Sequence, residues 1–337
     1  MNEISTVQTY RAYRAVQGPD GVRGGVEELE FSALPQGEVT VRVAYSSLNY
    51  KDALSARGRP GVTRHYPHTP GIDAAGTVVT ASSEKLKPGD KVIVSSYDLG
   101  MDTPGGFSEY IRVPEAWVVP LPSGLTLRSA MILGTAGFTA GLALAALLRQ
   151  GLSPQMGPVV VTGASGGVGS LAVALLNQNG FDVIASSGTE QAHEWLRKLG
   201  ARQVMDRGEL GESNGRPLLS ASYAGGIDTV GGDTLANLLK STKYGGAVAA
   251  CGLVQSPDLN VNVYPFILRS VSLLGIDSAN TPMELRRKIW GKLADPWRLP
   301  NLDMFAVDVE LDDLDPYIDR ILEGDVEGRV VAGVAGE

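Results

Sequence analysis

The chain has 337 residues, of which 43% are hydrophobic and 20% charged, which is ordinary for a globular protein long enough to form two domains. Its formal net charge of −8 argues against a generally basic surface of the kind that binds nucleic acid. The single cysteine, Cys251, excludes an intrachain disulfide and any zinc site built from several cysteines.

Targeting and membrane signals are not evident. No apolar run approaches the roughly 20 residues of a membrane-spanning helix. The first residues show no basic region followed by an apolar core, as a secretory signal would. We therefore expect a cytoplasmic enzyme without a membrane partner.

The first 130 residues are predicted to be rich in β-strands. Val39, Val41 and Val43 alternate with polar residues, which is typical of a half-buried strand. Further short strands are expected at 76–79 and 91–94, with a turn at 88–90 between them.

The pattern changes near residue 130. An Ala- and Leu-rich helix is expected at 130–148, and strands and helices then alternate. The expected strands are 159–162, 182–185, 227–230, 247–250 and 271–276; the expected helices are 168–179, 190–199 and 233–240. This alternation predicts an α/β domain with a doubly wound parallel sheet. The tail is mixed, with helices near 283–293 and 314–322 and strands near 305–309 and 328–332.

The segment 159–170 is the most informative. A buried β-branched strand, Val159–Val161, leads into Gly163, Gly166, Gly167 and Gly169, and a helix follows. Glycines allow a tight turn and a close approach of the backbone to a pyrophosphate, and the helix N-terminus offers free N–H groups. We expect a dinucleotide there; the alternative is a plain strand–turn–helix connection.

Several segments together resemble the zinc-independent quinone oxidoreductase branch of the medium-chain dehydrogenase/reductase superfamily, most closely its acryloyl-CoA reductase group. The segments are Ser46–Asp52, Pro70–Asp73, Lys87–Val92, Gly134–Ala140, Thr162–Gly169, Tyr244–Gly252, Pro265–Arg269, Gly275–Ser278 and Glu327–Arg329. The resemblance implies a GroES-like β-barrel substrate domain over residues 1–130 and 278–337. It implies a Rossmann NADPH-binding domain over residues 131–277.

Zinc is not expected. Where zinc alcohol dehydrogenases carry a cysteine and later a Gly-His-Glu triplet, this chain has Asn49-Tyr50 and Gly71-Ile72-Asp73. His65 and His68 have no evident third ligand nearby, so a solvated loop is the better interpretation.

NADPH is expected rather than NADH. The second strand of the alternating region ends in hydroxyl residues and lacks the carboxylate that usually binds an NAD ribose. The resemblance implies that Ser187, Gly188 and Thr189 hold the 2′-phosphate and that Arg207 supplies charge; for Arg207 the alternative is a solvated loop cation.

Other cofactor contacts are implied by the resemblance alone. Ser165, Gly166, Gly167 and Val168 belong to the glycine-rich turn, and Leu253, Ile267 and Ser278 follow the nicotinamide half, with sheet packing as the alternative for the first two. Thr135 and Thr139 either approach the nicotinamide or, for Thr135, cap a helix.

Tyr50 is the residue expected nearest the chemistry. Reduction of an activated C=C bond needs a hydrogen-bond donor for the enolate, which a tyrosine hydroxyl can provide. The alternative is that Tyr50 only packs against the cofactor. For Asn49 and Asp73 we expect either a supporting role next to the site or a structural role in the barrel.

The expected activity is reduction of a short enoyl thioester such as acryloyl-CoA with NADPH. The alternatives are an NADPH:quinone oxidoreductase and a non-catalytic NADPH-binding protein. The basic loop 57–64, with Arg57, Arg59 and Arg64, either meets the phosphates of coenzyme A or is simply a solvated loop. The resemblance also implies a homodimer joined at the apolar strand 271–276.

Overall fold

The computed structural model describes residues 7–82 and 84–336, which form two compact units. The first unit contains the described residues up to Thr135, the segment Ala279–Ala294 and the described residues from Asn301 onward. The second contains Ala136–Ser278 and Asp295–Pro300. The sequence predicts divisions at residues 130 and 278; the units divide after Thr135 and Ser278, and Asp295–Pro300 falls in the second unit rather than the first.

A mostly antiparallel sheet forms the body of the first unit, with the strand order β14-β15-β3-β4-β5-β7 and with β6 paired to β3. Its strands are β3 (Val39–Leu48), β4 (Asp73–Ala81), β5 (Lys91–Ser95), β6 (Tyr110–Val113), β7 (Val118–Pro120), β14 (Ala306–Glu310) and β15 (Arg329–Gly333). The helices of this unit are α1 (Tyr50–Ala56), α8 (Met283–Ala294) and α9 (Asp315–Glu323). Val39, Val41 and Val43 are fully buried in its core, as their alternation predicts.

The tail of the chain completes this sheet. Strand β15 runs antiparallel to β3, with Val330 opposite Leu48 and Gly333 opposite Tyr45. The segment that follows the second unit in sequence is therefore paired with a strand from the first 50 residues.

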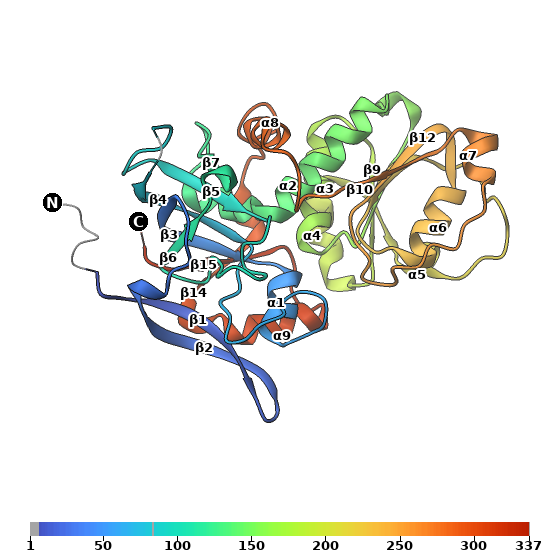
Figure 1. The fold of residues 1–337 in the computed structure, drawn as a ribbon. Helices are drawn as coiled ribbons and strands as arrows, with labels where there is room; N and C mark the ends of the chain where they lie inside the picture. The colour runs from blue at the N-terminus through green and yellow to red at the C-terminus, as the bar shows by residue number, and fades with distance from the viewer. Residues whose placement is uncertain (1–6, 83, 337) are drawn as a thin grey trace. The chain divides into compact units, whose positions relative to one another are not determined.

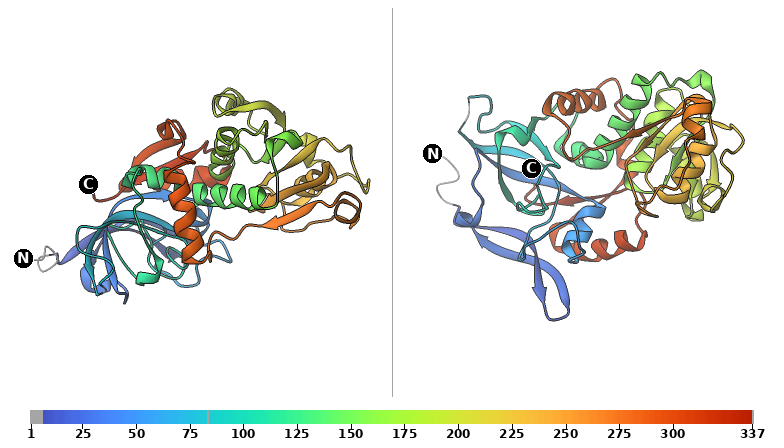
Figure 2. Two further views of the ribbon diagram at one scale, coloured as in Figure 1. Left: turned by 90° about the horizontal axis from the view of Figure 1, so that it is seen from above. Right: turned by 45° about the vertical axis from the view of Figure 1, so that its right-hand side comes forward.

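A long hairpin precedes the sheet and was not anticipated from the sequence. Strands β1 (Thr9–Gly18) and β2 (Gly21–Glu30) pair along their whole length, and the hairpin end projects from the rest of the first unit (Figures 1 and 2). A Cβ on Gly24 would lie 2.2 Å from the Tyr13 ring, so the ring of one strand covers a glycine of the other. The glycines of β2 interrupt the alternation by which a strand is recognised.

The second unit contains the predicted doubly wound parallel sheet, with the strand order β10-β9-β8-β11-β12-β13. Its strands are β8 (Val159–Thr162), β9 (Val183–Ser187), β10 (Ala201–Asp206), β11 (Tyr223–Asp228), β12 (Thr242–Ala250) and β13 (Ser272–Gly275). Its short and medium helices are α3 (Gly167–Gln178), α4 (His193–Lys198), α5 (Gly208–Gly211), α6 (Gly232–Lys240) and α7 (Tyr264–Arg269). Helices α3 and α6 cover opposite faces of the sheet (Figure 1).

Strand β10 is the element of this sheet that the sequence analysis did not predict. Its residues, Ala-Arg-Gln-Val-Met-Asp, neither alternate nor form an apolar run, because β10 is an edge strand with three exposed positions. It pairs with β9 so that Asp206 lies opposite Ser187. This register brings the residue after β10 to the end of β9.

Helix α2 (Leu127–Arg149) is longer than predicted and is broken at Gly134, whose φ is 49° and ψ −157°. Among the described residues it is the one helix whose length and composition would suffice to cross a membrane, although 83% of its most apolar stretch is buried within the structure. The expectation that no apolar run approaches the length of a membrane span was therefore wrong for this helix, in which glycines and threonines at 134–141 lie among the apolar residues.

Candidate functional site

The glycine-rich turn after β8 has the conformation that a phosphate cradle needs. Gly163 has a φ of 60°, which favours glycine, and a Cβ on Gly169 would lie only 2.2 Å from the Gly163 carbonyl oxygen. At Gly166, in contrast, a Cβ would approach only that same oxygen, at 3.4 Å. Gly163 and Gly169 are thus required for the turn and its packing, whereas Gly166 leaves open space at the start of α3, where free N–H groups favour an anion.

The ends of β9 and β10 form the next part of this edge. Ser187 donates a hydrogen bond to Ser165 Oγ at 3.1 Å, and Thr189 N–H donates to Ser187 Oγ at 3.1 Å. The side chain of Arg207 lies against Gly188, because a Cβ there would be 2.5 Å from Arg207 Cδ and 2.7 Å from its Nε. The structure therefore brings together the hydroxyls and the cation that the sequence predicts around a 2′-phosphate.

This cluster also contains an acid that the sequence analysis did not consider. Asp206 lies at the end of β10, beside Arg207, and its Oδ1 accepts a hydrogen bond from Gly208 N–H at 2.7 Å. The carboxylate thus holds the turn that carries Arg207. The position of Asp206 beside Ser187 follows only from β10, a strand that was not predicted.

The point at which the strand order reverses, between β8 and β11, is closed by hydrogen bonds. Thr162 donates to Asp228 Oδ1 at 2.7 Å, and Asp228 Oδ2 accepts from Gly231 N–H at 2.8 Å. Burial raises the pKa of Asp228, and these bonds oppose the shift. In open α/β sheets, ligands bind outside the carboxyl ends of the strands at such a reversal, and the glycine-rich turn begins there.

Of the residues expected along the nicotinamide half, the structure brings two to this edge. Leu253 follows β12 and is 64% exposed, with its Cα 3.2 Å from where a Cβ on Gly231 would lie. Ser278 follows β13, also at the carboxyl end. Ile267, which is 66% exposed, lies on α7, whose Arg269 donates to the carbonyl of Thr242 at the amino end of β12. Within one chain the structure does not bring Ile267 to the glycine-rich turn.

Tyr50 occupies a second candidate site, in the first unit. It is the first residue of α1 and is 44% exposed. Asn49 caps this helix together with Asp52, whose Oδ2 accepts the Asn49 N–H at 2.8 Å. The cap fixes where α1 starts and leaves the Tyr50 side chain accessible.

A buried carboxylate, Asp73 at the start of β4, is hydrogen-bonded to the helix cap Asn49. Its oxygens accept hydrogen bonds from Asn49 Nδ2 at 2.8 Å, Ser47 Oγ at 2.9 Å, and both the backbone N–H and the hydroxyl of Thr135. Arg329 Nη2 lies 4.0 Å away and is also fully enclosed. This network connects Asn49 and Asp73, and both expected roles, support of Tyr50 and stabilisation of the barrel, stay predictions. It also includes Ser47 and Arg329, which were not expected at a site.

The break in α2 exists because of this network. A Cβ on Gly134 would lie 2.6 Å from Ser47 Oγ and 2.7 Å from Asp73 Oδ2. Only glycine allows the backbone to come this close to Ser47 and Asp73. This conformation places the Thr135 N–H within hydrogen-bonding distance of Asp73. Thr135 therefore begins a helical segment capped by Asp73, and its hydroxyl proton is already donated to that carboxylate.

Two titrating groups in the cluster are strongly influenced by burial. Burial and the neighbouring Asp73 carboxylate raise the pKa of Asp52 to about 7, against N–H donors from Asn49 and Ile72 that lower it. Burial lowers the pKa of Arg329, and the charges of Asp73 and Asp52 oppose that shift.

The hypothesis that the 57–64 loop binds coenzyme A fails for Arg57. Its side chain is only 6% exposed and pairs with Asp319 at 2.7 Å and Asp315 at 3.0 Å, so it fastens α1 to α9. Arg64 is exposed but lies 3.4 Å from Asp102. A sequence cannot show that a loop arginine has acidic partners 258 residues away.

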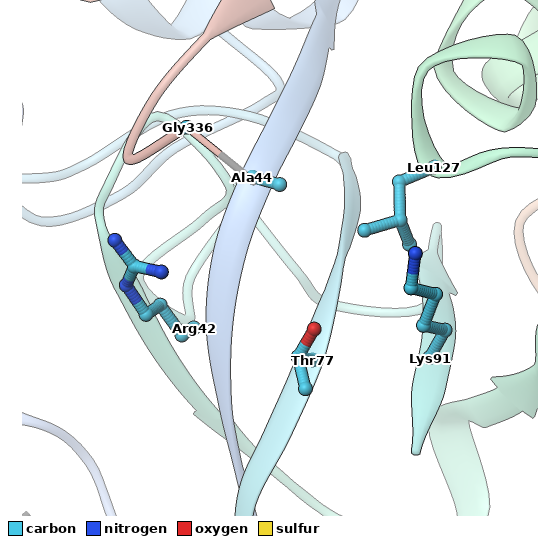
Figure 3. A pocket seen from close by; sticks show the side chains of 6 residues that line it. All are labelled: Arg42, Ala44, Thr77, Lys91, Leu127 and Gly336. Atoms are coloured by element: carbon cyan, nitrogen blue, oxygen red, sulfur yellow. The ribbon is translucent and has the colours of Figure 1, made fainter. Parts of the chain in front are cut away.

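Away from these residues, the described part of the chain shows no metal cluster and two pockets in the first unit. No group of three or more His, Cys, Asp or Glu side chains among residues 7–82 and 84–336 could hold a metal ion. A small pocket of about 100 Å³ is lined by Arg42, Thr77 and Lys91, which lie on the three adjacent strands β3, β4 and β5 (Figure 3). It is smaller than the roughly 300 Å³ at the low end of small-molecule sites. A second pocket in the first unit has about 460 Å³ and is lined mostly by the segments Lys85–Leu86, Asp90–Lys91 and Pro120–Ser123.

Comparisons with known proteins agree with this architecture. Residues 35–123 match the alcohol dehydrogenase GroES-like domain, and residues 167–294 match the zinc-binding dehydrogenase family. The acrylyl-CoA reductase AcuI of Ruegeria pomeroyi is 46% identical over 93% of this chain and 94% of its own length. YhfP of Bacillus subtilis, which carries a quinone oxidoreductase name, is 43% identical over 96% of this chain and 98% of its own.

A solved structure is equally similar. The yhdH oxidoreductase of Salmonella enterica, in complex with NADP, has a TM-score of 0.93 and 45% identity, covering 96% of this chain and 99% of its own. YhfP has been solved with NAD bound, with a TM-score of 0.94. The expected combination of a GroES-like and a Rossmann domain is confirmed, and the chain belongs to the quinone oxidoreductase and acrylyl-CoA reductase branch of the medium-chain dehydrogenase/reductase superfamily.

Proposed function

We propose that this protein is an NADPH-dependent oxidoreductase that reduces the activated C=C bond of a short enoyl thioester such as acrylyl-CoA. The observation that carries the cofactor assignment is the packing of Arg207 against Gly188, beside the Ser187 hydroxyl. A cation and hydroxyls suit a 2′-phosphate, and β9 ends without a carboxylate that would repel it. The thioester assignment follows the relative from Ruegeria pomeroyi.

The residues that would hold the cofactor follow the carboxyl edge of the parallel sheet. The pyrophosphate would be held at the start of α3 by Ser165, Gly166, Gly167 and Val168. The 2′-phosphate would be held by Ser187, Gly188, Thr189 and Arg207. The nicotinamide half would be contacted by Leu253 and Ser278. The open space at Gly166 supports this assignment. Ile267 is not included, because α7 lies at the opposite edge of the sheet in the same chain.

Bound NADPH supplies the hydride that is transferred to the β-carbon of the substrate. Tyr50 is the proposed catalytic residue and also a cofactor contact. Its hydroxyl would donate a hydrogen bond to the thioester oxygen as negative charge develops there, and a water molecule would then give a proton to the α-carbon and leave as hydroxide. The buried Asp73 network would hold Asn49, and with it the start of α1, in a fixed position.

Zinc is not part of this proposal. The carboxylate of Asp73 lies where the zinc alcohol dehydrogenases carry their Gly-His-Glu triplet, which Gly71-Ile72-Asp73 does not match. Its oxygens already accept hydrogen bonds from Ser47, Asn49 and Thr135. A metal would have to displace all of these donors.

We also propose a cytoplasmic homodimer. Strand β13 pairs only with β12 among the described residues, and its Leu273 is 37% exposed. On the neighbouring strand β12 and just after it, the apolar side chains of Tyr244 and Val254 are more than 70% exposed. An open strand edge with apolar surroundings favours pairing with a second copy.

The test is NADPH oxidation measured in parallel with acrylyl-CoA, crotonyl-CoA and 1,4-benzoquinone. The proposal predicts the highest kcat/KM with one of the two thioesters. Rapid reduction of the quinone with neither thioester consumed would favour the alternative that the name of YhfP suggests. Tight NADPH binding without turnover of any of them would favour a non-catalytic role.

A further inference from the structure

Two consecutive residues after β5 have an unusual backbone conformation. Ser96 has a φ of 64° and Tyr97 a φ of 52°, the left-handed region that residues with a Cβ rarely adopt. Such a conformation persists only where the surroundings hold it, and it is often found at functional sites. Ser96 is 4% exposed, so the turn is also buried.

The surroundings hold this turn firmly. Ser96 N–H donates to Ile72 O at 2.7 Å, and Tyr97 N–H donates to Ala279 O at 3.0 Å. The Tyr97 ring is stacked on Trp117, with centroids 5.7 Å apart, and the guanidinium of Arg286 lies 4.4 Å from its centroid. The position of the Ser96 side chain is therefore imposed by groups from several distant segments.

The result is a directed chain of hydrogen bonds. Ser96 Oγ lies 3.1 Å from Thr135 Oγ1, and Thr135 Oγ1 donates to Asp73 Oδ1 at 2.8 Å. Because the Thr135 hydroxyl has one proton and gives it to Asp73, Ser96 must be the donor in the first bond. Ser96 thus orients Thr135, and Thr135 orients the carboxylate.

The other oxygen of Asp73 continues the chain toward Tyr50. Asp73 Oδ2 accepts from Asn49 Nδ2 at 2.8 Å, and Asn49 caps the helix whose first residue is Tyr50. We propose that Ser96 is a positioning residue for Tyr50, acting through Thr135, Asp73 and Asn49. The inference rests on the proposed function, which makes Tyr50 the hydrogen-bond donor to the thioester oxygen.

The alternative is that Ser96 merely satisfies a buried turn. Two substitutions separate the cases. Ser96→Ala removes the hydroxyl and keeps the strained backbone, whereas Ser96→Gly removes the hydroxyl and relieves the strain. Ser108→Ala is the matched control, since Ser108 is a buried serine of the same unit that donates to Tyr110 O at 2.8 Å, outside the network.

We expect both Ser96 variants to lower kcat by about fivefold or more, because small displacements of a catalytic group are costly, with KM for NADPH unchanged. Ser96→Gly should do so without loss of thermal stability. Combined with Tyr50→Phe, it should add almost nothing to the effect of Tyr50→Phe alone, since both act on one group.

A readout that needs no substrate keeps the inference separable from the proposed function. In a ¹³C-tyrosine NMR spectrum of the 11 tyrosines, the Tyr50 signal is assigned by its loss in Tyr50→Phe. It should shift or broaden in both Ser96 variants and stay in place in Ser108→Ala. An unmoved signal, a full kcat in Ser96→Gly, or additive effects with Tyr50→Phe would overturn the inference. Absence of turnover in the wild type, with the signal shifted as expected, would count against the proposed function alone.

Discussion

Arg207 offers the sharpest test of the cofactor assignment. Ser187 is held by two internal bonds, because its hydroxyl donates to Ser165 and accepts the Thr189 N–H. The hydroxyl of Ser187 therefore mainly holds its neighbours in place and contributes less to binding of a phosphate. The charge of Arg207 is then the main reason why NADPH should bind more tightly than NADH. Arg207→Ala removes that charge.

The magnitude follows from the setting. A hydrogen bond to a charged group contributes about 1.5–3 kcal/mol, which corresponds to roughly 10- to 150-fold in the dissociation constant. Because Arg207 is exposed to water, we expect the lower end, about tenfold for NADPH. The dissociation constant of NADH should stay within about twofold, since it has no 2′-phosphate.

Two further variants complete the design. Gly188→Ala should also weaken NADPH binding, because the new Cβ would lie 2.5 Å from Arg207 Cδ and would push the arginine side chain away. Arg202→Ala is the matched control, since Arg202 lies in β10, the strand that precedes Arg207, and pairs with Asp182 at 2.6 Å. Binding is measured by titration calorimetry with both cofactors. Equal binding of NADPH and NADH by the wild type, or an equal loss in the Arg202 and Arg207 variants, would refute the reasoning.

Four other predictions follow from the structure. Turnover should survive dialysis against a chelator, and elemental analysis should find no stoichiometric zinc; chelator-sensitive activity with one zinc per chain would show the opposite. Sedimentation should give a dimer, and Leu273→Pro should yield monomers or aggregates because proline removes a donor from strand β13; a wild-type monomer at micromolar concentration would contradict this. Burial raises the pKa of Cys251 to about 12, so a thiol reagent at pH 8 should label it slowly in the folded protein and rapidly after unfolding. The pKa of Asp52 in the folded protein, about 7, lies above its ordinary value of 3.8, so the contribution of Asp52 to the free energy of unfolding should fall as pH rises from about 4 to 7. Urea titrations should show that this fall with pH is missing in Asp52→Asn. If the variant shows the same fall as the wild type, Asp52 is not its source.

Much of the second unit could be predicted from the sequence alone. Val159–Val161 and the glycines after them specify a strand, a tight turn and a helix through local preferences, so these elements could be predicted without knowledge of the fold. The alternating strands and helices then specified a doubly wound parallel sheet. The match of several separated motifs was enough to indicate the family.

The polar network of the first unit was decided by the tertiary structure. Asp73, Thr135 and Arg329 are separated by 62 and 194 residues, and nothing local in the sequence indicates that they meet. Their meeting depends on the left-handed backbone of Gly134 and on the pairing of β15 with β3. The same holds for Arg57, whose charge suggested a ligand until Asp315 and Asp319 were found beside it. Local sequence specifies an element because helix, strand and turn preferences act between neighbouring residues, whereas the partner of a buried charge is chosen by the packing of distant segments.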